Sequence, residues 1–356
     1  MKQVFKNLNL NGILTDILVE NGKIAKIGSI NENGIDFSGK SVFPGFIDIH
    51  IHGCLGFDTM DGDSLNEISK YLATRGVTSF MPTTMTVDFN DIKKVVNGEL
   101  PLVQGAQILG YHLEGPYIAS SRRGAQNIKY IRKPDIKEFE SLENILMVTV
   151  APEVEGGQDF IKNCKAVVSI GHTDGTFEDC LKAIENGAKC LTHTFNAMPP
   201  MLHRAPGPVG AAIMGEAYVQ VICDGVHIHP AVIQMLYRTF TRERMVLISD
   251  AMKATGMPDG VYEFGGQPVK VENSLAKTLD GVVAGSTSDL LTGVKKAMEF
   301  GIPKEDAVYM ASKTPAMLMG LNKGEIKVGY DADFIVTDEK MNILYTVAGG
   351  NVVYKK

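Results

Sequence analysis

The chain has 356 residues, of which 44% are hydrophobic and 21% charged, and its formal net charge is −6. This composition is typical of a globular protein, and the chain is long enough to bury a large core without disulfide bonds. A negative net charge argues against nucleic acid or an anionic membrane as partner, because both are bound by basic patches. The five cysteines are odd in number and include no CxxC pair, so we expect free thiols and a cytoplasmic protein. Residues 1–7 are not followed by the apolar run that a signal peptide has. The sequence also contains no run of about 18 apolar residues, so we expect no membrane association.

Residues 1–42 and 324–356 are both expected to form short β-strands. Asn21-Gly22 separates two apolar segments and predicts a tight hairpin turn, since both residues tolerate positive φ. Gly349-Gly350-Asn351 predicts a second turn near the C-terminus. Short β segments at opposite ends of a chain make poor domains alone, so we expect them to combine into one small β-sandwich.

Residues 43–323 alternate between short apolar runs and helix-like stretches. The eight apolar runs are 43–50, 78–82, 108–114, 147–151, 166–171, 189–193, 219–224 and 246–250. Eight strand–helix alternations predict an α/β fold of the TIM type, a (β/α)8 barrel. Apolar segments at 262–270 and 279–283 predict an inserted hairpin after the eighth strand, before a helix from Asp289 to Phe300. A capping box formed by Ser64 and Glu67 is expected to begin the first helix.

Ionisable side chains gather at the ends of these runs. In a parallel barrel the C-terminal ends of the strands meet at one mouth, where catalytic groups lie. The residues at these ends are His50, His52, Glu114, His172, His193 and Asp250. Burying so many ionisable groups is costly unless a divalent ion pairs with them, and imidazole and carboxylate ligands suit zinc, iron, manganese or cobalt. The sequence therefore predicts a metal site at the barrel mouth, with His112 in the barrel interior.

The motifs around these residues resemble a known family. The segment PGFIDIHIHG at 44–53 looks like the first-strand signature of the amidohydrolase superfamily. Within it, the motifs similar to those of the N-acetylglucosamine-6-phosphate deacetylases are HLEGPY at 112–117, GHT at 171–173, THTFNAM at 192–198, CDGVH at 223–227 and ISDA at 248–251. The resemblance covers nearly the whole chain, including the split β domain.

The resemblance implies a metal centre that holds one or two divalent ions per subunit. Glu114, His172 and His193 would bind the main ion. His50 and His52 would complete a second site, which Glu114 bridges. Zinc is the expected metal, with iron, manganese and cobalt as alternatives.

The resemblance also implies substrate contacts. Asn196, Ala197, Arg204 and His227 would contact a 6-phosphate, and Gln126 would hydrogen-bond a sugar hydroxyl in place of a histidine found in many relatives. In relatives part of the phosphate site comes from a second subunit, so a homodimer is expected. The expected partner is therefore a small phosphorylated amino sugar.

The expected reaction is removal of the acetyl group from N-acetyl-D-glucosamine 6-phosphate to give glucosamine 6-phosphate and acetate, in amino-sugar catabolism and cell-wall recycling. The metal would turn bound water into hydroxide that attacks the amide, with Asp250 as general base and acid. One alternative is the galactosamine epimer as substrate. Another is a different amidohydrolase reaction on an N-acyl or cyclic amide, which the absence of a lysine at the central strand ends disfavours. A third is a barrel without catalysis that serves in assembly, which the complete ligand set disfavours.

Overall fold

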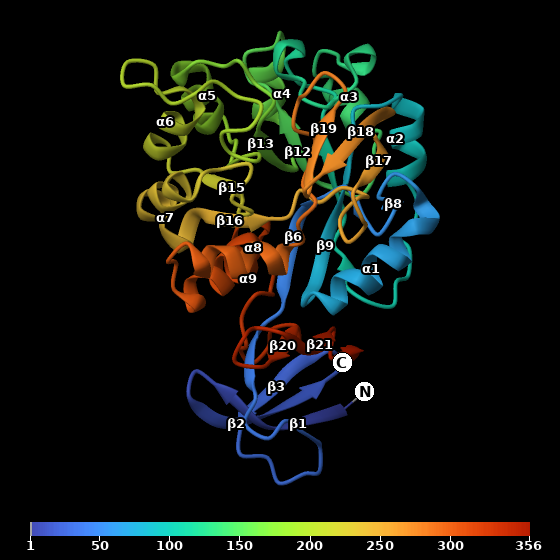
Figure 1. Cartoon of the computed structure of the whole chain (residues 1–356), viewed down its shortest axis with the longest axis vertical. Coiled ribbons are helices and arrows are strands. Elements are labelled where there is room, and N and C mark those ends of the chain that lie inside the picture. The colour runs from blue at the N-terminus through green and yellow to red at the C-terminus, as the bar shows by residue number, and fades with distance from the viewer. Residues whose placement is uncertain (1) are drawn as a thin grey trace.

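A computed structural model describes residues 2–356 and divides them between two units (Figure 1). A barrel of parallel strands with helices around it forms the larger unit. A sheet built from both ends of the chain forms the smaller unit, beyond the N-terminal ends of two barrel strands, β6 (Phe46–Ile51) and β9 (Val77–Thr84). The mouth formed by the C-terminal strand ends therefore faces away from the small unit. No helix within residues 2–356 is long and apolar enough to cross a membrane.

The predicted eight-stranded barrel is confirmed. After β6 and β9 its strands are β11 (Tyr111–Glu114), β12 (Ile145–Val150), β13 (Val167–Ile170), β14 (Cys190–Leu191), β15 (Tyr218–Ile222) and β16 (Met245–Ile248), with the short β10 (Gln107–Ile108) beside β9. Neighbouring strands pair in parallel from β6 to β16. The Asp250 amide donates to the His50 carbonyl at 2.9 Å, which connects the last strand to the first.

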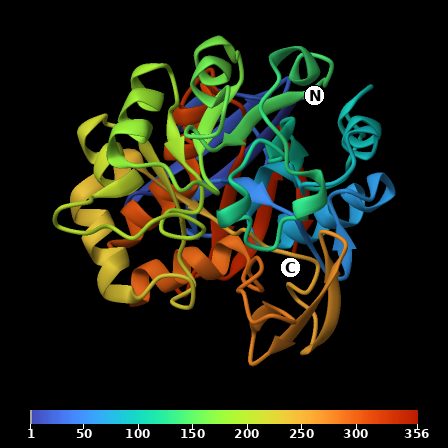
Figure 2. The ribbon, with the colours of Figure 1, turned by 90° about the horizontal axis from the view of Figure 1, so that it is seen from above.

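Helices surround these strands, as the view from above shows (Figure 2). They are α1 (Leu65–Thr74), α2 (Phe89–Val96), α3 (Ile136–Phe139), α4 (Gly157–Asn163), α5 (Phe177–Glu185), α6 (Gly207–Met214), α7 (Pro230–Arg244), α8 (Leu290–Glu299) and α9 (Lys304–Met319). The predicted helix from Asp289 to Phe300 is α8, and the Asp289 carboxylate caps it by accepting from the Thr292 amide at 2.8 Å. The predicted capping box at α1 is wrong. Ser64 already belongs to a 3-10 turn, Gly62–Ser64, and its helical backbone holds the hydroxyl away from the amides that it would cap.

The expected small β domain formed by both ends of the chain is present, and its strands form a single, mostly antiparallel sheet. Its strands are β1 (Lys2–Leu10), β2 (Ile13–Glu20), β3 (Lys23–Gly28), β4 (Ile35–Asp36), β5 (Ser41–Pro44), β20 (Phe334–Thr337), β21 (Ile343–Ala348) and β22 (Asn351–Lys355). Both predicted turns are present, since Asn21 and Gly22 have φ of 51° and 77°, and Gly349 and Gly350 have φ of 54° and 80°. The rings of Phe5 and Phe334, from opposite ends of the chain, pack edge to face in the core of this unit, with their centroids 5.0 Å apart.

The junction between the two units lies at Gly45. The predicted first barrel run begins at Phe43, but Ser41–Pro44 pairs with β20 in the small sheet and only Phe46–Ile51 belongs to the barrel. A Cβ at Gly45 would lie 2.2 Å from the Thr78 side chain, so glycine permits this close passage. We therefore propose to shift the domain boundary expected between residues 42 and 43 to Gly45, and to keep the second one between 323 and 324.

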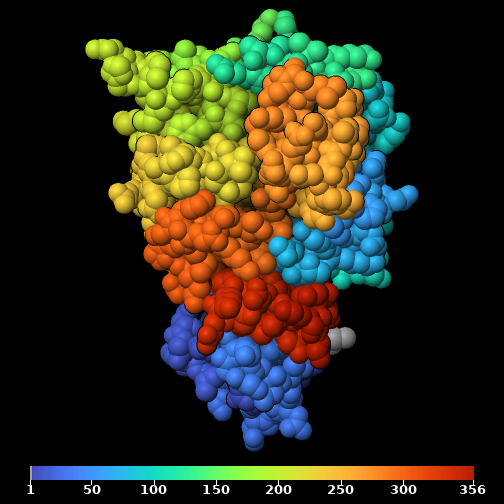
Figure 3. Space-filling view, viewed as in Figure 1, coloured from blue at the N-terminus to red at the C-terminus, as the bar shows by residue number. Residues whose placement is uncertain are grey.

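An insertion between β16 and α8 lies beside the barrel mouth. An inserted hairpin is present, but its strands are not the two predicted segments. The segment 262–270 is divided between β17 (Gly260–Phe264) and β18 (Gln267–Glu272), which pair with each other, and β19 (Leu275–Thr278) adds a third antiparallel strand. The predicted partner segment 279–283 follows β19 and forms no strand. In the space-filling view this insertion covers one side of the barrel (Figure 3, orange). A smaller hairpin, β7 (Gly53–Cys54) with β8 (Phe57–Asp58), follows β6.

Candidate metal centre and substrate pocket

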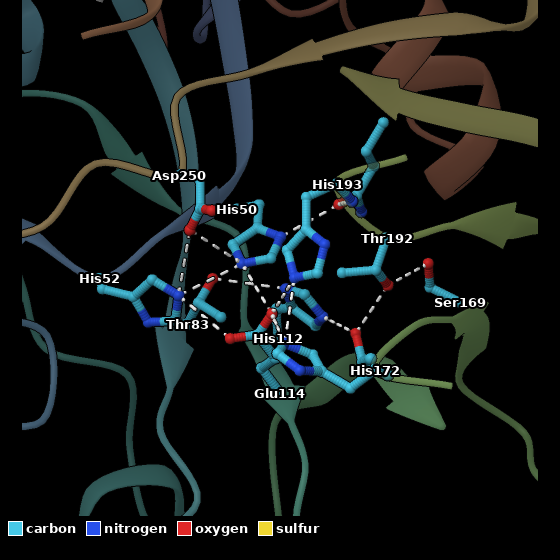
Figure 4. A network of polar contacts seen from close by, with 12 residues as sticks. His50, His52, Thr83, His112, Glu114, Ser169, His172, Thr192, His193 and Asp250 are labelled. Carbon is cyan, nitrogen blue, oxygen red and sulfur yellow. Dashed lines mark hydrogen bonds and ion pairs between the residues drawn. The ribbon is translucent and has the colours of Figure 1, made fainter. Parts of the chain in front are cut away.

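The ionisable residues predicted from the strand ends converge in the structure (Figure 4). His50 is the penultimate residue of β6, His52 follows that strand, and Glu114 ends β11. His172, His193 and Asp250 follow β13, β14 and β16 by two residues each. All six side chains are buried, so their charges must be neutralised by one another or by an ion.

One group is formed by Glu114, His172 and His193. The His193 Nε2 atom lies 3.0 Å from the Glu114 Oε1 atom and 3.1 Å from the His172 Nε2 atom. The His172 Nε2 atom is 3.4 Å from the same carboxylate oxygen. Three potential ligand atoms therefore face a common point.

The second group is formed by His50, His52 and Glu114. The two Nε2 atoms of the histidines are 3.2 Å apart. The His50 Nε2 atom is 3.3 Å from Glu114 Oε1, whereas the His52 Nε2 atom is 3.2 Å from Glu114 Oε2. Glu114 thus offers oxygen atoms to both groups, as the expected bridging role requires.

The two groups fit a divalent metal ion. Bonds of about 2.0–2.1 Å to nitrogen or oxygen place tetrahedral ligand atoms about 3.3 Å apart, which agrees with the separations in both groups. Imidazole and carboxylate are also the ligand types that such ions take. The chain can therefore hold a divalent metal at either group.

Several of these residues have unusual backbone angles. His172, His193 and Asp250 have φ of 48°, 26° and 48° in a region that residues other than glycine rarely adopt. Strain of this kind concentrates at functional sites, where the surrounding fold maintains it. Here it turns each side chain toward the common centre immediately after its strand.

Asp250 lies against the second group. Its Oδ1 atom is 3.3 Å from the His52 Nε2 atom and 3.4 Å from the His50 Nε2 atom. Burial alone would raise the pKa of Asp250, but the neighbouring His50 and His52 lower it to about 2. The carboxylate is therefore ionised near neutral pH and able to accept a proton.

His112 belongs to neither group, as its predicted interior position implies. Its Nε2 atom is 2.8 Å from the Thr149 hydroxyl. Its ring packs edge to face on the ring of His50, with the two ring centroids 4.6 Å apart. Burial, aided by the charge of His50, keeps the pKa of His112 well below its ordinary value. His112 is therefore neutral, and it packs against the His50 ring without being a metal ligand.

A cavity of about 410 Å³ opens above the metal ligands. Four of the five residues expected to contact substrate line it, namely Gln126, Asn196, Ala197 and His227. The walls also include Arg122, Arg123, Phe264 and residues 282–285 of the insertion. The cavity thus combines metal ligands, cationic groups and an apolar wall.

Gln126 lines the cavity but its amide is already engaged. Its Nε2 atom donates to Glu114 Oε2 at 2.8 Å, and its Oε1 atom accepts from the Thr86 amide at 2.7 Å. These contacts make Gln126 a support for the bridging carboxylate. Binding a sugar hydroxyl, as expected from the sequence, remains a prediction that would need the second amide hydrogen.

Arg204 lies outside the cavity. It is exposed, and its guanidinium contacts the His203 ring at 2.7 Å. The Asn196 amide, expected to help bind phosphate, donates instead to the His193 carbonyl at 2.9 Å. Phosphate contacts by these groups therefore remain predictions.

His227 is held by a carboxylate that sequence analysis did not assign. The Asp224 Oδ2 atom lies 2.7 Å from His227 Nδ1, and Asp224 Oδ1 accepts from the His227 amide at 2.9 Å. Burial would lower the pKa of His227, but the hydrogen bond and charge of Asp224 raise it above its ordinary value. The raised pKa favours the cationic form of His227, and a cation in the cavity lining suits an anionic substrate.

Arg122 and Arg123 are the other cavity residues that sequence analysis missed. The Arg122 carbonyl accepts from His172 Nδ1 at 2.8 Å, which fixes the orientation of that imidazole. Two adjacent arginines after the Glu114 motif were a visible signal. Their position depends on the path of an irregular loop, which residue patterning does not predict.

Comparisons with known proteins agree with this geometry. Residues 41–353 match the Amidohydrolase family. N-acetylglucosamine-6-phosphate deacetylases from Lysinibacillus sphaericus and Vibrio furnissii are 37% and 38% identical, over 95% and 94% of this chain and 92% and 89% of theirs. An N-acetylgalactosamine-6-phosphate deacetylase from Escherichia coli O157:H7 is 34% identical over 91% of each chain.

Solved structures of the same enzymes superpose over nearly the whole chain. An N-acetylglucosamine-6-phosphate deacetylase from Thermotoga maritima is 31% identical with a TM-score of 0.91, covering 99% of this chain and 100% of that one. A mutant deacetylase from Mycobacterium smegmatis in complex with N-acetyl-D-glucosamine-6-phosphate is 28% identical with a TM-score of 0.90, with the same coverage. The chain therefore belongs to the amidohydrolase family and, within it, to the N-acetylglucosamine-6-phosphate deacetylases.

Proposed function

We propose that this enzyme hydrolyses the acetamide bond of N-acetyl-D-glucosamine 6-phosphate to yield glucosamine 6-phosphate and acetate. The observation that carries this proposal is the position of Asp250. Its carboxylate lies within 3.4 Å of both His50 and His52, beside two groups able to bind a divalent ion, at the base of the cavity. Metal-assisted hydrolysis of an amide needs a metal and one acid–base group together at such a place.

The residues divide the reaction between them. A divalent ion held by Glu114, His172 and His193 would lower the pKa of water and polarise the amide carbonyl. Asp250 accepts the proton from the attacking water and delivers it to the amide nitrogen as the C–N bond breaks. The amine then leaves as a neutral group, and the acetyl carbon gains the water oxygen.

The proposed substrate is anionic, and the cavity can receive its phosphate. His227 carries a raised pKa, and Arg122 and Arg123 lie in the same wall. A related structure holds N-acetyl-D-glucosamine-6-phosphate, which supports the gluco epimer. The 34% identical relative named for the galacto epimer keeps N-acetylgalactosamine 6-phosphate as the second candidate.

A homodimer would explain the position of Arg204. This arginine is exposed, and it lies beside Met201 and Leu202, which are 41% and 54% exposed. These exposed apolar side chains next to a cation are available for contact with a second subunit. We place Arg204 at the phosphate of the neighbouring subunit's cavity.

Zinc is the proposed metal, because tetrahedral nitrogen and oxygen ligands suit it, with iron, manganese and cobalt as alternatives. All five cysteines are free, which supports a reducing compartment such as the cytoplasm. There the reaction would serve amino-sugar catabolism and cell-wall recycling.

The test is amine release from N-acetylglucosamine 6-phosphate, N-acetylgalactosamine 6-phosphate and the two unphosphorylated sugars. We expect rapid release from the gluco phosphate and much slower release from the unphosphorylated sugars. Asp250→Asn tests the acid–base role. It should lower kcat by about 10²–10⁴-fold because general acid–base catalysis is lost, and its metal content should be unchanged. Equal rates with and without phosphate, or full activity in Asp250→Asn, would contradict the proposal.

A further inference from the structure

The second metal group is supported by a buried amide inside the barrel. Gln220 lies on β15, and its side chain is fully buried in the barrel interior. Its Oε1 atom is 3.0 Å from the His50 Nδ1 atom, on the side of the ring opposite the ligand atom. The contact therefore reaches the imidazole without using its metal-facing nitrogen.

The orientation of this amide follows from a second neighbour. The His193 backbone amide points at the same Gln220 Oε1 atom at 3.4 Å, and a backbone N–H can only donate. The Gln220 Nε2 atom faces the sulfur of Met147 at 3.4 Å, which is a weak acceptor. The oxygen of Gln220 must therefore be the atom that faces His50.

An amide oxygen only accepts hydrogen bonds, so the His50 Nδ1 atom must carry a hydrogen. In the neutral imidazole, which is the form that binds a metal, the His50 Nε2 atom then keeps its lone pair, and it lies 3.2 Å from His52 Nε2 and 3.3 Å from Glu114 Oε1. An imidazole held in this tautomer is prepared to bind a metal through Nε2.

The two metal groups share this construction. In the first group the Arg122 carbonyl accepts from His172 Nδ1 at 2.8 Å, and in the second group Gln220 does the same for His50. The other histidine of each group, His193 or His52, has a buried Nδ1 atom without a hydrogen-bond partner among residues 2–356. Each group thus has one histidine with a fixed tautomer, and in the second group a side chain fixes it.

We propose that Gln220 is a positioning residue for the second metal ion, and that it determines whether this enzyme holds two ions or one. The inference rests on the metal dependence in the proposed function, and it concerns only the group of His50, His52 and Glu114. Partners that orient a metal-ligating histidine typically change metal affinity by about 10–100-fold. Loss of the Gln220 oxygen frees His50 to rotate or change tautomer, and the second ion then binds more weakly.

The experiment titrates metal-free protein with Zn²⁺ at equilibrium and counts bound ions per subunit by elemental analysis. Gln220→Leu removes the acceptor, Gln220→Glu keeps an oxygen in its place, and Thr149→Val is a matched control that removes a hydroxyl from His112 and from no ligand. We expect two ions in the unmodified enzyme, in Thr149→Val and in Gln220→Glu. In Gln220→Leu the first ion should bind as before and the second about 10–100-fold more weakly. If Gln220→Leu does not fold, as thermal unfolding would show, Gln220→Met serves in its place with the same expectation.

Three results would overturn the proposal. They are two ions of unchanged affinity in Gln220→Leu, an equal loss of both ions, or a single ion in the unmodified enzyme at saturating Zn²⁺. A failure of the proposed function differs from all three, because the unmodified enzyme would then bind its ions with the predicted dependence on Gln220 but release no amine from hexosamine phosphates.

Discussion

At the scale of single residues, the ligands and their supports differ in how far the sequence predicts them. His50, Glu114, His172 and His193 were predicted because they lie at or just past the C-terminal ends of apolar strands. In a parallel barrel these strand ends meet at one mouth. Gln220 was not predicted, because it lies in mid-strand, and its contact with His50 depends on the stagger between β15 and β6, which are separated in the barrel by β16.

His227 and Asp224 give a prediction about pH. The carboxylate of Asp224 raises the pKa of His227 despite burial, so His227 stays cationic to a higher pH than an ordinary histidine. In Asp224→Asn the charge is lost and the pKa of His227 falls. The KM for the phosphorylated sugar should then begin to rise at lower pH than in the unmodified enzyme, with little change in kcat.

The measurement is the pH profile of KM and kcat for the phosphorylated sugar. The unphosphorylated sugar is the control, because its KM should follow the same pH dependence in both proteins. Superimposable KM profiles for the phosphorylated sugar would show that Asp224 does not act through His227.

At the scale of elements, the insertion shows which features the pattern of apolar residues in the sequence can predict and which it cannot. The apolar segments at 262–270 and 279–283 predicted an inserted hairpin, but the observed hairpin lies within residues 260–272, and its position at the cavity wall was not predicted. That position depends on packing between segments that are distant in the sequence. The rings of Phe264 and His52 pack edge to face with their centroids 5.2 Å apart, and the Gln267 side chain donates to the Ala125 carbonyl at 2.5 Å. The predicted capping box at Ser64 failed for a related reason, because a preceding turn had already made that residue helical.

Phe264→Ala tests the role of the insertion as the cavity wall. Phe264 is buried in a small cluster with Met85, Met252 and Val269, separate from the main barrel core. Removing a buried phenylalanine costs about 3–5 kcal/mol, and here the loss should fall on the insertion and not on the barrel. We expect faster amide hydrogen exchange in residues 260–278 and a higher KM.

Val261→Ala is the matched control, because Val261 lies on the same strand but is 69% exposed. It should leave exchange and KM almost unchanged. Unchanged exchange in Phe264→Ala, or uniformly faster exchange throughout the barrel, would contradict a separately stabilised wall.

At the scale of the whole molecule, the two units have different tasks. The small sheet joins both ends of the chain below the barrel, while every candidate ligand lies at the opposite end, where the strands terminate (Figure 1). The overall fold was predictable because eight alternations and two turn motifs are local signals. The net charge of −6 gave no hint of an anionic substrate, because the few cationic residues that line the cavity, Arg122, Arg123 and His227, do not change the sign of the total.

The most direct test of the account is amine release from N-acetylglucosamine 6-phosphate by protein stripped with a chelator and then titrated with Zn²⁺. The predicted result is negligible release by the metal-free protein, rising with the number of ions bound per subunit, because the buried histidines and Glu114 act only through an ion. Metal-free protein that releases amine at the full rate would contradict metal-dependent deacetylation.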